Sequence, residues 1–518
     1  MGLEETVIRG ARFGALLSVV AALQLCGATA LGQGGEDAPA TRPNVLLIVS
    51  EDNGPHLGCY GDAQARTPRL DRFAEQGVRF RTTYSTASVC SPARASILTG
   101  LYPHEHGQMG LATHKHRMYR PWPNLLSLFR QAGYRTGMIG KLHINPESAF
   151  PLDMHAFAGS NFNKRPVAAM ARRGMEFVDE AEAPFLLVVN FPDAHFPLLA
   201  RQDGLPEEPR TAGDVRAWTW LASESERLRG YVADYYNCLE RLDAGVGMLL
   251  DGLEERGLSD DTIVVYVADH GPQFSRGKTS AYEPGLRVPL IVRTPECMGS
   301  GALRSELVST VDILPTILDC AGLAVPEELS GRSLRALLKG GEDTPWRSYL
   351  VGMGIGGAPI IYFPQYAIRD ERFGLIVSPV RGRANTNAVA YREHHNAFFK
   401  AGTEPAEIAA AGEEARGIYA RYVQPPEVEL YDLTEDPDQR VDLADDPEHQ
   451  STRERLFDAL TQWRDSRHDP LANSAMLLEF TEINDSLVGQ AYRKDPQFVW
   501  PHLDAWSAYV HGAEENSK

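Results

Sequence analysis

Residues 90–100 read CSPARASILTG, and this stretch predicts a short helix of unusual character. Ser91 is a good N-cap and Pro92 suits the first helical position, so we expect the helix to begin just after Cys90. The closing glycine is typical of a helix C-terminus. Arg94 then falls in the first turn, where a cation opposes the positive end of the helix macrodipole. A residue that breaks a local rule in this way indicates a functional site.

A bound anion would resolve this unfavourable placement. Arg94 and the free N–H groups of the first turn would hold the anion jointly, with Cys90 beside it. The alternative is a buried structural cysteine followed by an ordinary surface helix.

The regions around this helix predict an α/β fold. Nearly continuous apolar runs, typical of strands buried on both faces of a parallel sheet, occupy residues 44–49, 185–190, 262–268 and 288–292. Helical patterns occupy residues 68–76, 124–132, 223–256 and 311–321. The alternation predicts a central, mostly parallel sheet flanked by helices, in a domain over residues 40–355.

The pattern changes after residue 355. Residues 360–368, 373–377 and 428–431 are typical of strands, and residues 450–464 are typical of a helix. Residues 384–421 are polar and give no clear pattern. We therefore expect a smaller C-terminal α+β subdomain over residues 356–518.

The first 32 residues have the pattern of a secretory signal peptide. Arg9 and Arg12 precede an apolar run over residues 13–25, and small residues follow up to Gly32. The alternative, a membrane anchor, is disfavoured because the run is too short to span a bilayer. We expect an exported protein without a membrane span, located in the periplasm or outside the cell, or in the lysosome of a eukaryote.

Composition and charge restrict the partners. The 518 residues are 43% hydrophobic and 23% charged, which is typical of a globular protein. The net charge of −18 argues against nucleic acids and anionic lipid surfaces as partners. An anionic substrate would therefore need a locally basic pocket.

The pattern of cysteines does not predict a set of disulfides. Of the six, Cys26 lies in the predicted signal peptide, and four others could form two disulfides: Cys59, Cys238, Cys297 and Cys320. Their irregular spacing predicts neither a disulfide scaffold nor a zinc site. We expect most of them to be small buried hydrophobic residues.

Acidic clusters follow two of the predicted strands. Ser50-Glu51-Asp52-Asn53-Gly54 follows the first run, and Ala268-Asp269-His270-Gly271 follows the third. Ligands of parallel sheets bind at the carboxyl ends of the strands, so we expect these side chains to converge. Carboxylates brought together repel each other unless a cation lies between them, and oxygen ligands favour calcium or magnesium. Taken singly, each cluster could equally cap a turn.

Cationic residues lie beyond predicted strand ends as well. They are Lys141 and His143 in Gly140-Lys141-Leu142-His143, His195 in Phe191-Pro192-Asp193-Ala194-His195, and Lys278 after Gly277. A lone lysine or histidine in a loop is usually solvated, but the common location predicts that these residues gather in one site.

A histidine-rich stretch follows the helix of residues 90–100. It contains His104, His106, His114 and His116. The irregular spacing favours a solvated loop at the border of the substrate pocket over a transition-metal site.

The Cys-x-Pro-x-Arg pattern of Cys90, Pro92 and Arg94, with its Ala-Ser-Ile-Leu-Thr-Gly tail, resembles the signature of the type I sulfatases in the alkaline-phosphatase-like superfamily. In that family a maturation enzyme, the formylglycine-generating enzyme or an equivalent, oxidises the cysteine to formylglycine. The hydrate of this aldehyde is the nucleophile. Ala93 stands at a variable position where many relatives have serine.

The resemblance implies roles for the remaining site residues. Glu51, Asp52, Asp269 and His270 match the metal ligands, with the formylglycine at Cys90 completing a site for calcium. Glu51 replaces the more usual aspartate, and His270 stands where asparagine is common. Arg94, Lys141, His143, His195 and Lys278 match the residues that bind sulfate and move protons. His195 or Lys278 would protonate the leaving group, and His143 would take a proton from the intermediate.

Longer stretches resemble the heparan N-sulfatases. They are HEHGQMGL at residues 104–111, GKLHINPESAFPLD at 140–153 and QWRDSRHDP at 462–470. Lys278 departs from the arginine expected in sulfamidases. The resemblance favours N-sulfoglucosamine of heparan-type glycans as the substrate. The alternatives are an O-sulfatase for another glycan or small ester, a phosphodiester or phosphonate hydrolase of the same superfamily, and a non-catalytic binder of sulfated glycans with unmodified Cys90.

Overall fold

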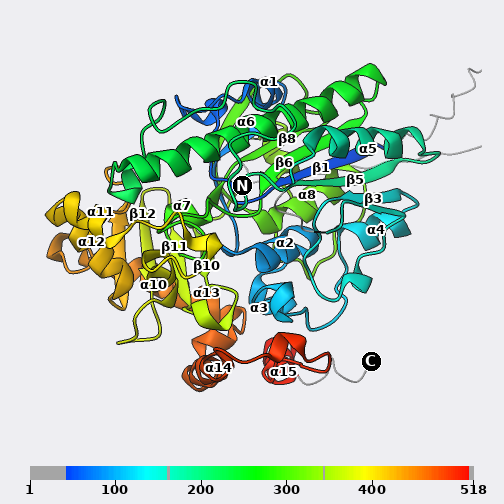
Figure 1. Ribbon diagram of the computed structural model, residues 1–518. Coiled ribbons are helices and arrows are strands. Elements are labelled where there is room, and N and C mark those ends of the chain that lie inside the picture. Colours follow the sequence, from blue (N-terminus) through cyan, green and yellow to red (C-terminus); the bar gives the residue numbers. More distant parts are fainter. Residues whose placement is uncertain (1–41, 160–163, 342–344, 513–518) are drawn as a thin grey trace, which may run out of the picture. The chain divides into compact units, whose positions relative to one another are not determined.

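A computed structural model describes residues 42–159, 164–341 and 345–512. The predicted signal peptide lies outside these residues. Nine strands form one large sheet, in the order β4-β3-β5-β1-β6-β8-β2-β7 with β9 beside β2 (Figure 1). The strands are β1 (Asn44–Ser50), β2 (Val78–Tyr84), β3 (Arg135–Ile139), β4 (Met154–Ala156), β5 (Phe185–Phe191), β6 (Thr262–Ala268), β7 (Arg287–Val288), β8 (Leu290–Arg293) and β9 (Ala302–Ser309).

The centre of this sheet is parallel. Strand β1 pairs in parallel with both β5 and β6, and β3 pairs in parallel with β5 and β4. Strand β8 pairs antiparallel with β6 and β2. The apolar run at residues 288–292 therefore corresponds to two short antiparallel strands, β7 and β8, rather than to one parallel strand. The predicted α/β class with a mostly parallel central sheet is confirmed.

Helices cover both faces of the sheet because successive residues of β1 point to opposite sides. Leu46 and Ile48 pack in one core with α1 (Pro68–Glu75), α5 (Val167–Asp179) and α6 (Glu226–Glu255). Val45 and Leu47 pack in another with α2 (Cys90–Thr99), α4 (Leu125–Gln131) and α8 (Ile313–Cys320). All four side chains are fully buried, which stabilises the fold by about 1.5–3 kcal/mol for each.

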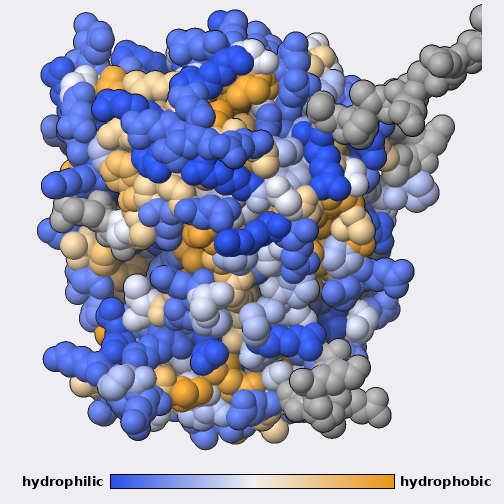
Figure 2. All heavy atoms as spheres, turned by 90° about the vertical axis from the view of Figure 1, so that its right-hand side faces the viewer, coloured by the Kyte–Doolittle hydropathy of each residue, from blue (hydrophilic) through white to orange (hydrophobic). Residues whose placement is uncertain are grey.

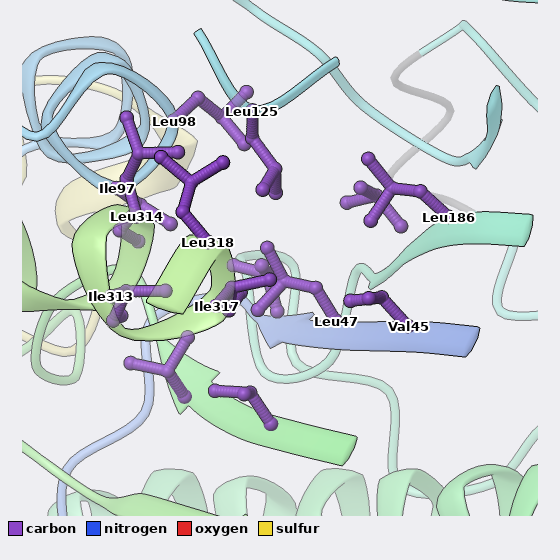
Figure 3. Packing of buried hydrophobic residues seen from close by; sticks show 14 of the residues in the cluster. Val45, Leu47, Ile97, Leu98, Leu125, Leu186, Ile313, Leu314, Ile317 and Leu318 are labelled. Carbon is purple, nitrogen blue, oxygen red and sulfur yellow. The ribbon is translucent and has the colours of Figure 1, made fainter. Parts of the chain in front are cut away.

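The second core fixes the helix that carries Cys90. Figure 3 shows Ile97 and Leu98 of α2 close to side chains of α8, with Leu47 of β1 near Ile317. Gly100 ends α2 at φ 68°, in the left-handed conformation that glycine adopts without steric cost. The start of α2 is thereby held against the rim of the sheet.

The C-terminal part contains a second sheet of four antiparallel strands. They are β10 (Leu350–Gly354), β11 (Gln365–Arg369), β12 (Phe373–Val377) and β13 (Val428–Asp432), and α13 (Gln450–Ser466) packs on them. A bridge between Ala87 and Met353 joins this sheet to the loop before α2. Because β10 precedes residue 355, the second sheet starts inside the first predicted domain, and the division at residue 355 stays a prediction.

Eight further α-helices lie in the described residues. They are α3 (Pro103–His106), α7 (Glu283–Leu286), α9 (Arg335–Leu338), α10 (Thr386–Arg392), α11 (Pro405–Ala410), α12 (Glu413–Val423), α14 (Ser474–Leu487) and α15 (Leu503–His511). The unassigned residues 384–421 thus contain three α-helices, the last of which ends at Val423, and one 3₁₀ turn, Ala397–Phe399. The predicted strand at residues 360–368 is wrong in its first half, where Pro359–Ile361 forms a 3₁₀ turn and only Gln365–Arg369 pairs as a strand.

Two further features concern the cysteines and the surface. All the cysteines that the structure describes (Cys59, Cys90, Cys238, Cys297 and Cys320) are free, so none of the possible bridges among them forms. Within the described ranges, no helix has both the length and the apolar character needed to cross a bilayer. The face shown in Figure 2 is mostly hydrophilic, with apolar residues in small groups.

Candidate active site

The two acidic clusters meet where β1 and β6 end. Ser50 and Ala268 are paired in the parallel ladder, so the residues that follow them emerge side by side. The backbone N–H of Asp52 donates to Oδ1 of Asp269 at 3.0 Å. Asp52 has a φ of 54°, in the left-handed region that residues other than glycine adopt uncommonly.

Asp52, Asp269, His270 and Cys90 form one compact buried group. Each offers a ligand atom, and these atoms lie within 4.8 Å of one another. Nδ1 of His270 donates to the carbonyl oxygen of Gly271 at 2.9 Å, so its proton is on that nitrogen. Nε2 of the neutral ring then presents a lone pair, 3.2 Å from Sγ of Cys90. Burial lowers the pKa of His270 and favours this neutral form.

The start of α2 brings Cys90 to this group, although not as the sequence predicts. The N-cap is Val89, and the helix begins at Cys90 rather than after it. Ser91 is therefore not the cap, and its hydroxyl oxygen accepts from the N–H of Ala112 at 2.9 Å. Cys90 is only 2% exposed.

Arg94 pairs with carboxylates from both strand ends. Its Nη2 lies 3.0 Å from Oε1 of Glu51 and 3.1 Å from Oδ2 of Asp269. Its Nη1 donates to the carbonyl oxygen of Lys141 and to the side chain of Asn190. These two carboxylates compensate the unfavourable position of the arginine in α2.

Two lysines also contact the carboxylates of this group. Nζ of Lys141 lies 3.3 Å from Oε1 of Glu51, and Nζ of Lys278 lies 2.9 Å from both carboxylate oxygens of Asp52. Burial acts to lower the pKa of Lys278, but the surrounding acidic groups, above all Asp52, together outweigh this effect and raise the pKa, so the lysine is charged. Burial raises the pKa of Asp52 even beside Lys278. This carboxylate is thus incompletely compensated in its buried position.

The two predicted catalytic histidines, His143 and His195, line the same cavity as Cys90. Burial, followed by the nearby lysines, lowers the pKa of both His143 and His195 well below the usual range, so both rings are neutral. Nδ1 of His195 donates to the carbonyl oxygen of Phe196 at 2.7 Å. His143 has a φ of 59°, and its buried ring nitrogens have no hydrogen-bond partner in the described part of the chain.

A cavity of about 470 Å³ opens over this group. Cys90, Lys141, His143, His195 and Lys278 line it together with residues from loops, short helices and the C-terminal region: Val89, Leu111, Thr113, His114, Gln273, Thr279, Gly356, Ala358, Ile360, Ile361, Tyr391, Asn396, Phe398, Phe399 and Arg493. The volume falls in the range of pockets for small molecules. The structure therefore brings every predicted catalytic residue except Arg94 to the wall of one cavity, and Arg94 lies beneath it, paired with Glu51 and Asp269.

The sequence did not reveal the charges that support His195. Asp193 is fully buried and receives hydrogen bonds from Nε and Nη2 of Arg241 at 3.1 and 2.6 Å. Nε of Arg165 lies 3.2 Å from the same carboxylate, and its Nη2 donates to the carbonyl oxygen of His195 at 2.8 Å. The two arginines come from distant segments, and only the presence of Asp193 beside His195 could have signalled them.

The histidine-rich stretch is not a solvated loop. His104 and His106 are fully buried, and His116 is 3% exposed. The ring of His116 stacks on Trp500 with centroids 3.9 Å apart, and His104 packs against Trp463. The expected position beside the pocket holds only for His114, which lines the cavity.

Comparisons with known proteins agree with this geometry. The family model described as Sulfatase matches residues 43–323, more than half of the 518 residues. A second, described as N-sulphoglucosamine sulphohydrolase, C-terminal, matches residues 274–379. The chain is 30% identical to human N-sulphoglucosamine sulphohydrolase over 474 residues, which cover 82% of this chain and 91% of that protein.

Two further similarities come from bacteria. A protein of Formosa agariphila named ulvan-active sulfatase is 26% identical over 455 residues, with 84% of this chain and 83% of that protein covered. The solved phosphonate monoester hydrolase from Silicibacter pomeroyi has a TM-score of 0.62 and 19% identity, with 82% and 95% covered, and this likeness shows the fold alone. The resemblance inferred from the Cys-x-Pro-x-Arg pattern is confirmed: the chain belongs to the sulfatase family, whose members hydrolyse sulfate esters or sulfamates.

Proposed function

We propose that this protein hydrolyses the sulfamate of N-sulfoglucosamine in heparan-type glycans, using a formylglycine formed from Cys90 and a bound calcium ion. In this reaction the S–N bond breaks, an S–O bond to an oxygen from water forms, and the products are the free amine and sulfate. The observation that carries the proposal is the position of Cys90, in one cavity with Lys141, His143, His195 and Lys278 and against the buried carboxylates of Asp52 and Asp269.

The substrate assignment is supported by the second family match. Residues 274–379 include Lys278 and the cavity wall at Gly356, Ala358, Ile360 and Ile361. The segment that matches the N-sulphoglucosamine sulphohydrolase model thus forms part of the cavity wall that would contact the substrate. Identity of 30% to the human protein along most of the chain adds to this support.

The donor set fits a divalent cation. Asp52, Asp269 and His270 would hold calcium together with residue 90, and Glu51 would add its Oε2 atom. That oxygen is buried and, among the described residues, has no hydrogen-bond partner, while Oε1 faces Arg94 and Lys141. Carboxylate oxygens are ligands that calcium prefers in proteins. When bound, the ion supplies positive charge for sulfate oxygens and for the oxygen nucleophile.

Conversion of Cys90 would supply the nucleophile, because the hydrate of formylglycine offers an oxygen where cysteine offers sulfur. Cys90 is buried at the start of α2, so the folded protein does not expose it to an enzyme. We therefore expect that a formylglycine-generating enzyme or its equivalent acts before folding is complete.

The cations would then act on the sulfate group. Lys141 and Lys278 line the cavity and would neutralise charge on the sulfuryl oxygens, and Arg94 would add to the positive potential from beneath. Well-placed groups of this kind lower an activation barrier by about 3–4 kcal/mol each.

The protonation states support a division of roles in proton transfer. Lys278 is charged, which favours it as the donor to the leaving nitrogen. His195 is neutral and its Nδ1 proton is engaged by Phe196, which makes it a poorer donor. Neutral His143, with both ring nitrogens unpartnered in the described structure, suits the role of proton acceptor.

The test is to co-express the chain with a formylglycine-generating enzyme and to assay the purified protein on four substrates. These are N-sulfoglucosamine, glucosamine 6-O-sulfate, a 2-O-sulfated uronate and a phosphonate monoester. We expect release from N-sulfoglucosamine to be fastest. Cys90→Ala should abolish it, whereas Cys297→Ala, at another buried cysteine, should retain it.

The other results would identify the alternatives. Release only from O-sulfates would contradict the sulfamate assignment and indicate an O-sulfatase. Preference for the phosphonate would indicate a phosphonate hydrolase. Binding without release, with Cys90 unmodified after co-expression, would indicate a glycan-binding protein.

A further inference from the structure

The charged side chains that line the cavity over Cys90 (Lys141, Lys278 and Arg493) are all positive, although the chain is acidic. Among the described residues that line it, none is an aspartate or glutamate. Lys141 and Lys278 lie at its buried end beside Cys90, and Arg493 and His114 line it as well. Arg493 is exposed to solvent whereas Lys141 and Lys278 are buried, so the cavity carries positive charge both at its buried part and at its surface.

Arg493 comes from the C-terminal region, in the 3₁₀ turn Tyr492–Lys494, which is held firmly against residues 113–115. Nε of Arg493 donates to the carbonyl oxygen of Thr113 at 2.9 Å. The hydroxyl of Tyr492 bonds Nδ1 of His114, and Nε1 of Trp500 donates to the carbonyl oxygen of His114 at 3.0 Å. These contacts place the guanidinium at the cavity wall.

The charged end of Arg493 is left for another partner. In the part of the chain that the structure describes, its Nη1 and Nη2 atoms make no hydrogen bond or ion pair, and the other charges on the cavity wall are also positive. A guanidinium presents a planar pair of donors suited to the two oxygens of a carboxylate or a sulfate. The groups that surround it thus favour an anion.

We infer that Arg493, with His114 beside it, forms a second anion subsite that binds a further carboxylate or sulfate of the glycan whose first sulfate lies at Cys90. The inference rests on the proposed function, because it takes the ligand of the cavity to be a sulfated glycan. It adds that the preferred substrate carries a second negative charge. Neither family match includes residue 493.

The test measures binding in the Cys90→Ala protein, which cannot turn over, by titration calorimetry with three ligands. They are N-sulfoglucosamine, glucosamine 2-N,6-O-disulfate, and a disaccharide of a uronate and N-sulfoglucosamine. We expect Arg493→Gln to weaken binding of a ligand with the second anion about tenfold and to change binding of N-sulfoglucosamine less than about twofold. Arg493→Lys should restore part of the loss.

Lys494→Gln is the matched control, since this neighbouring cation is exposed and does not line the cavity. It should leave all three affinities unchanged. A loss confined to the disulfate identifies a sulfate subsite, a loss confined to the disaccharide identifies a carboxylate subsite, and a loss for both identifies a general anion subsite. Each of these results supports the inference.

Equal effects of Arg493→Gln on all three ligands, no effect on any, or no binding of either doubly anionic ligand would overturn the inference. Hydrolysis by the matured wild-type protein is measured separately on the same ligands. Selective binding without hydrolysis would leave the subsite standing and contradict the proposed function. Hydrolysis of N-sulfoglucosamine with no selective effect of Arg493→Gln would support the proposed function and contradict the anion subsite.

Discussion

Lys278 holds both carboxylate oxygens of Asp52 at 2.9 Å, so one lysine contacts a proposed metal ligand and lines the substrate cavity at the same time. Lys278 therefore links the proposed metal site to the substrate cavity. This position also explains why the lysine keeps its charge in a buried place, since the adjacent carboxylate raises its pKa.

Replacement of this lysine tests its double role. We expect Lys278→Gln to lower kcat on N-sulfoglucosamine by about 10²–10³-fold, because a charge that stabilises the transition state and a proton donor are both lost. Lys278→Arg, which keeps the charge, should retain more activity. Steady-state kinetics measures both, and an unchanged kcat in Lys278→Gln would contradict the assignment.

Calcium should stabilise the folded protein measurably. At a free concentration about 100 times its Kd, a ligand that binds only the native state adds about 2.7 kcal/mol to the free energy of unfolding. We expect calcium to raise the unfolding temperature of the wild type, and a chelator to reverse the rise together with the activity.

Asp269→Asn should abolish this response. Asparagine keeps the Oδ1 acceptor that receives the N–H groups of Asp52 and His270, but it loses the charge. Asp504→Asn, at an exposed position, is the control. A calcium-dependent rise that survives in Asp269→Asn would place the ion elsewhere.

Glu51 should matter for stability as well as for the metal. Its Oε1 atom is the shared partner of Arg94 and Lys141 in a fully buried position. Removing one member of a buried ion pair costs about 3–5 kcal/mol because the remaining charge is left uncompensated. Chemical denaturation of the calcium-free protein should show a loss of this order in Glu51→Gln.

Glu51→Asp is the informative comparison, because it keeps the charge and shortens the side chain. It should recover much of the stability. If Glu51→Gln unfolds like the wild type, the ion pairs with Arg94 and Lys141 do not form as described.

We expect Asp193 to affect catalysis only by holding His195 in position, through Arg165. Asp193→Asn leaves Arg165 and Arg241 without their buried carboxylate, and Arg165 also holds the carbonyl oxygen of His195. We expect a loss of stability of about 3–5 kcal/mol and a fall in kcat with little change in KM. Asp203→Asn, at an exposed residue, should behave like the wild type. Unchanged kcat in Asp193→Asn would show that the cluster does not position His195.

The sequence predicts the central strands well because their burial is uniform. Residues 262–268 form a continuous apolar run, and β6 has those bounds. By contrast, β2 and β9 read VRFRTTY and ALRSELVS, in which polar residues alternate with apolar ones or follow them. These strands are stabilised by pairing with each other, a contact between distant segments that local patterns do not reveal.

The same distinction applies to the site. Asp52 and Asp269 could be predicted to meet, because parallel strands β1 and β6 end at one edge. The partners of Asp193 and the approach of Arg493 depend on tertiary contacts. The burial of His116 likewise follows from Trp500, a residue far along the chain, whose stacking excludes the solvent that a polar loop sequence implies.

The most direct test of the account is the mass spectrum of the peptide that contains Cys90, taken from protein co-expressed with a formylglycine-generating enzyme and shown to release sulfate from N-sulfoglucosamine. The account predicts a mass that corresponds to formylglycine at residue 90 in the active protein. Sulfate release by protein whose residue 90 is entirely unmodified cysteine would contradict it.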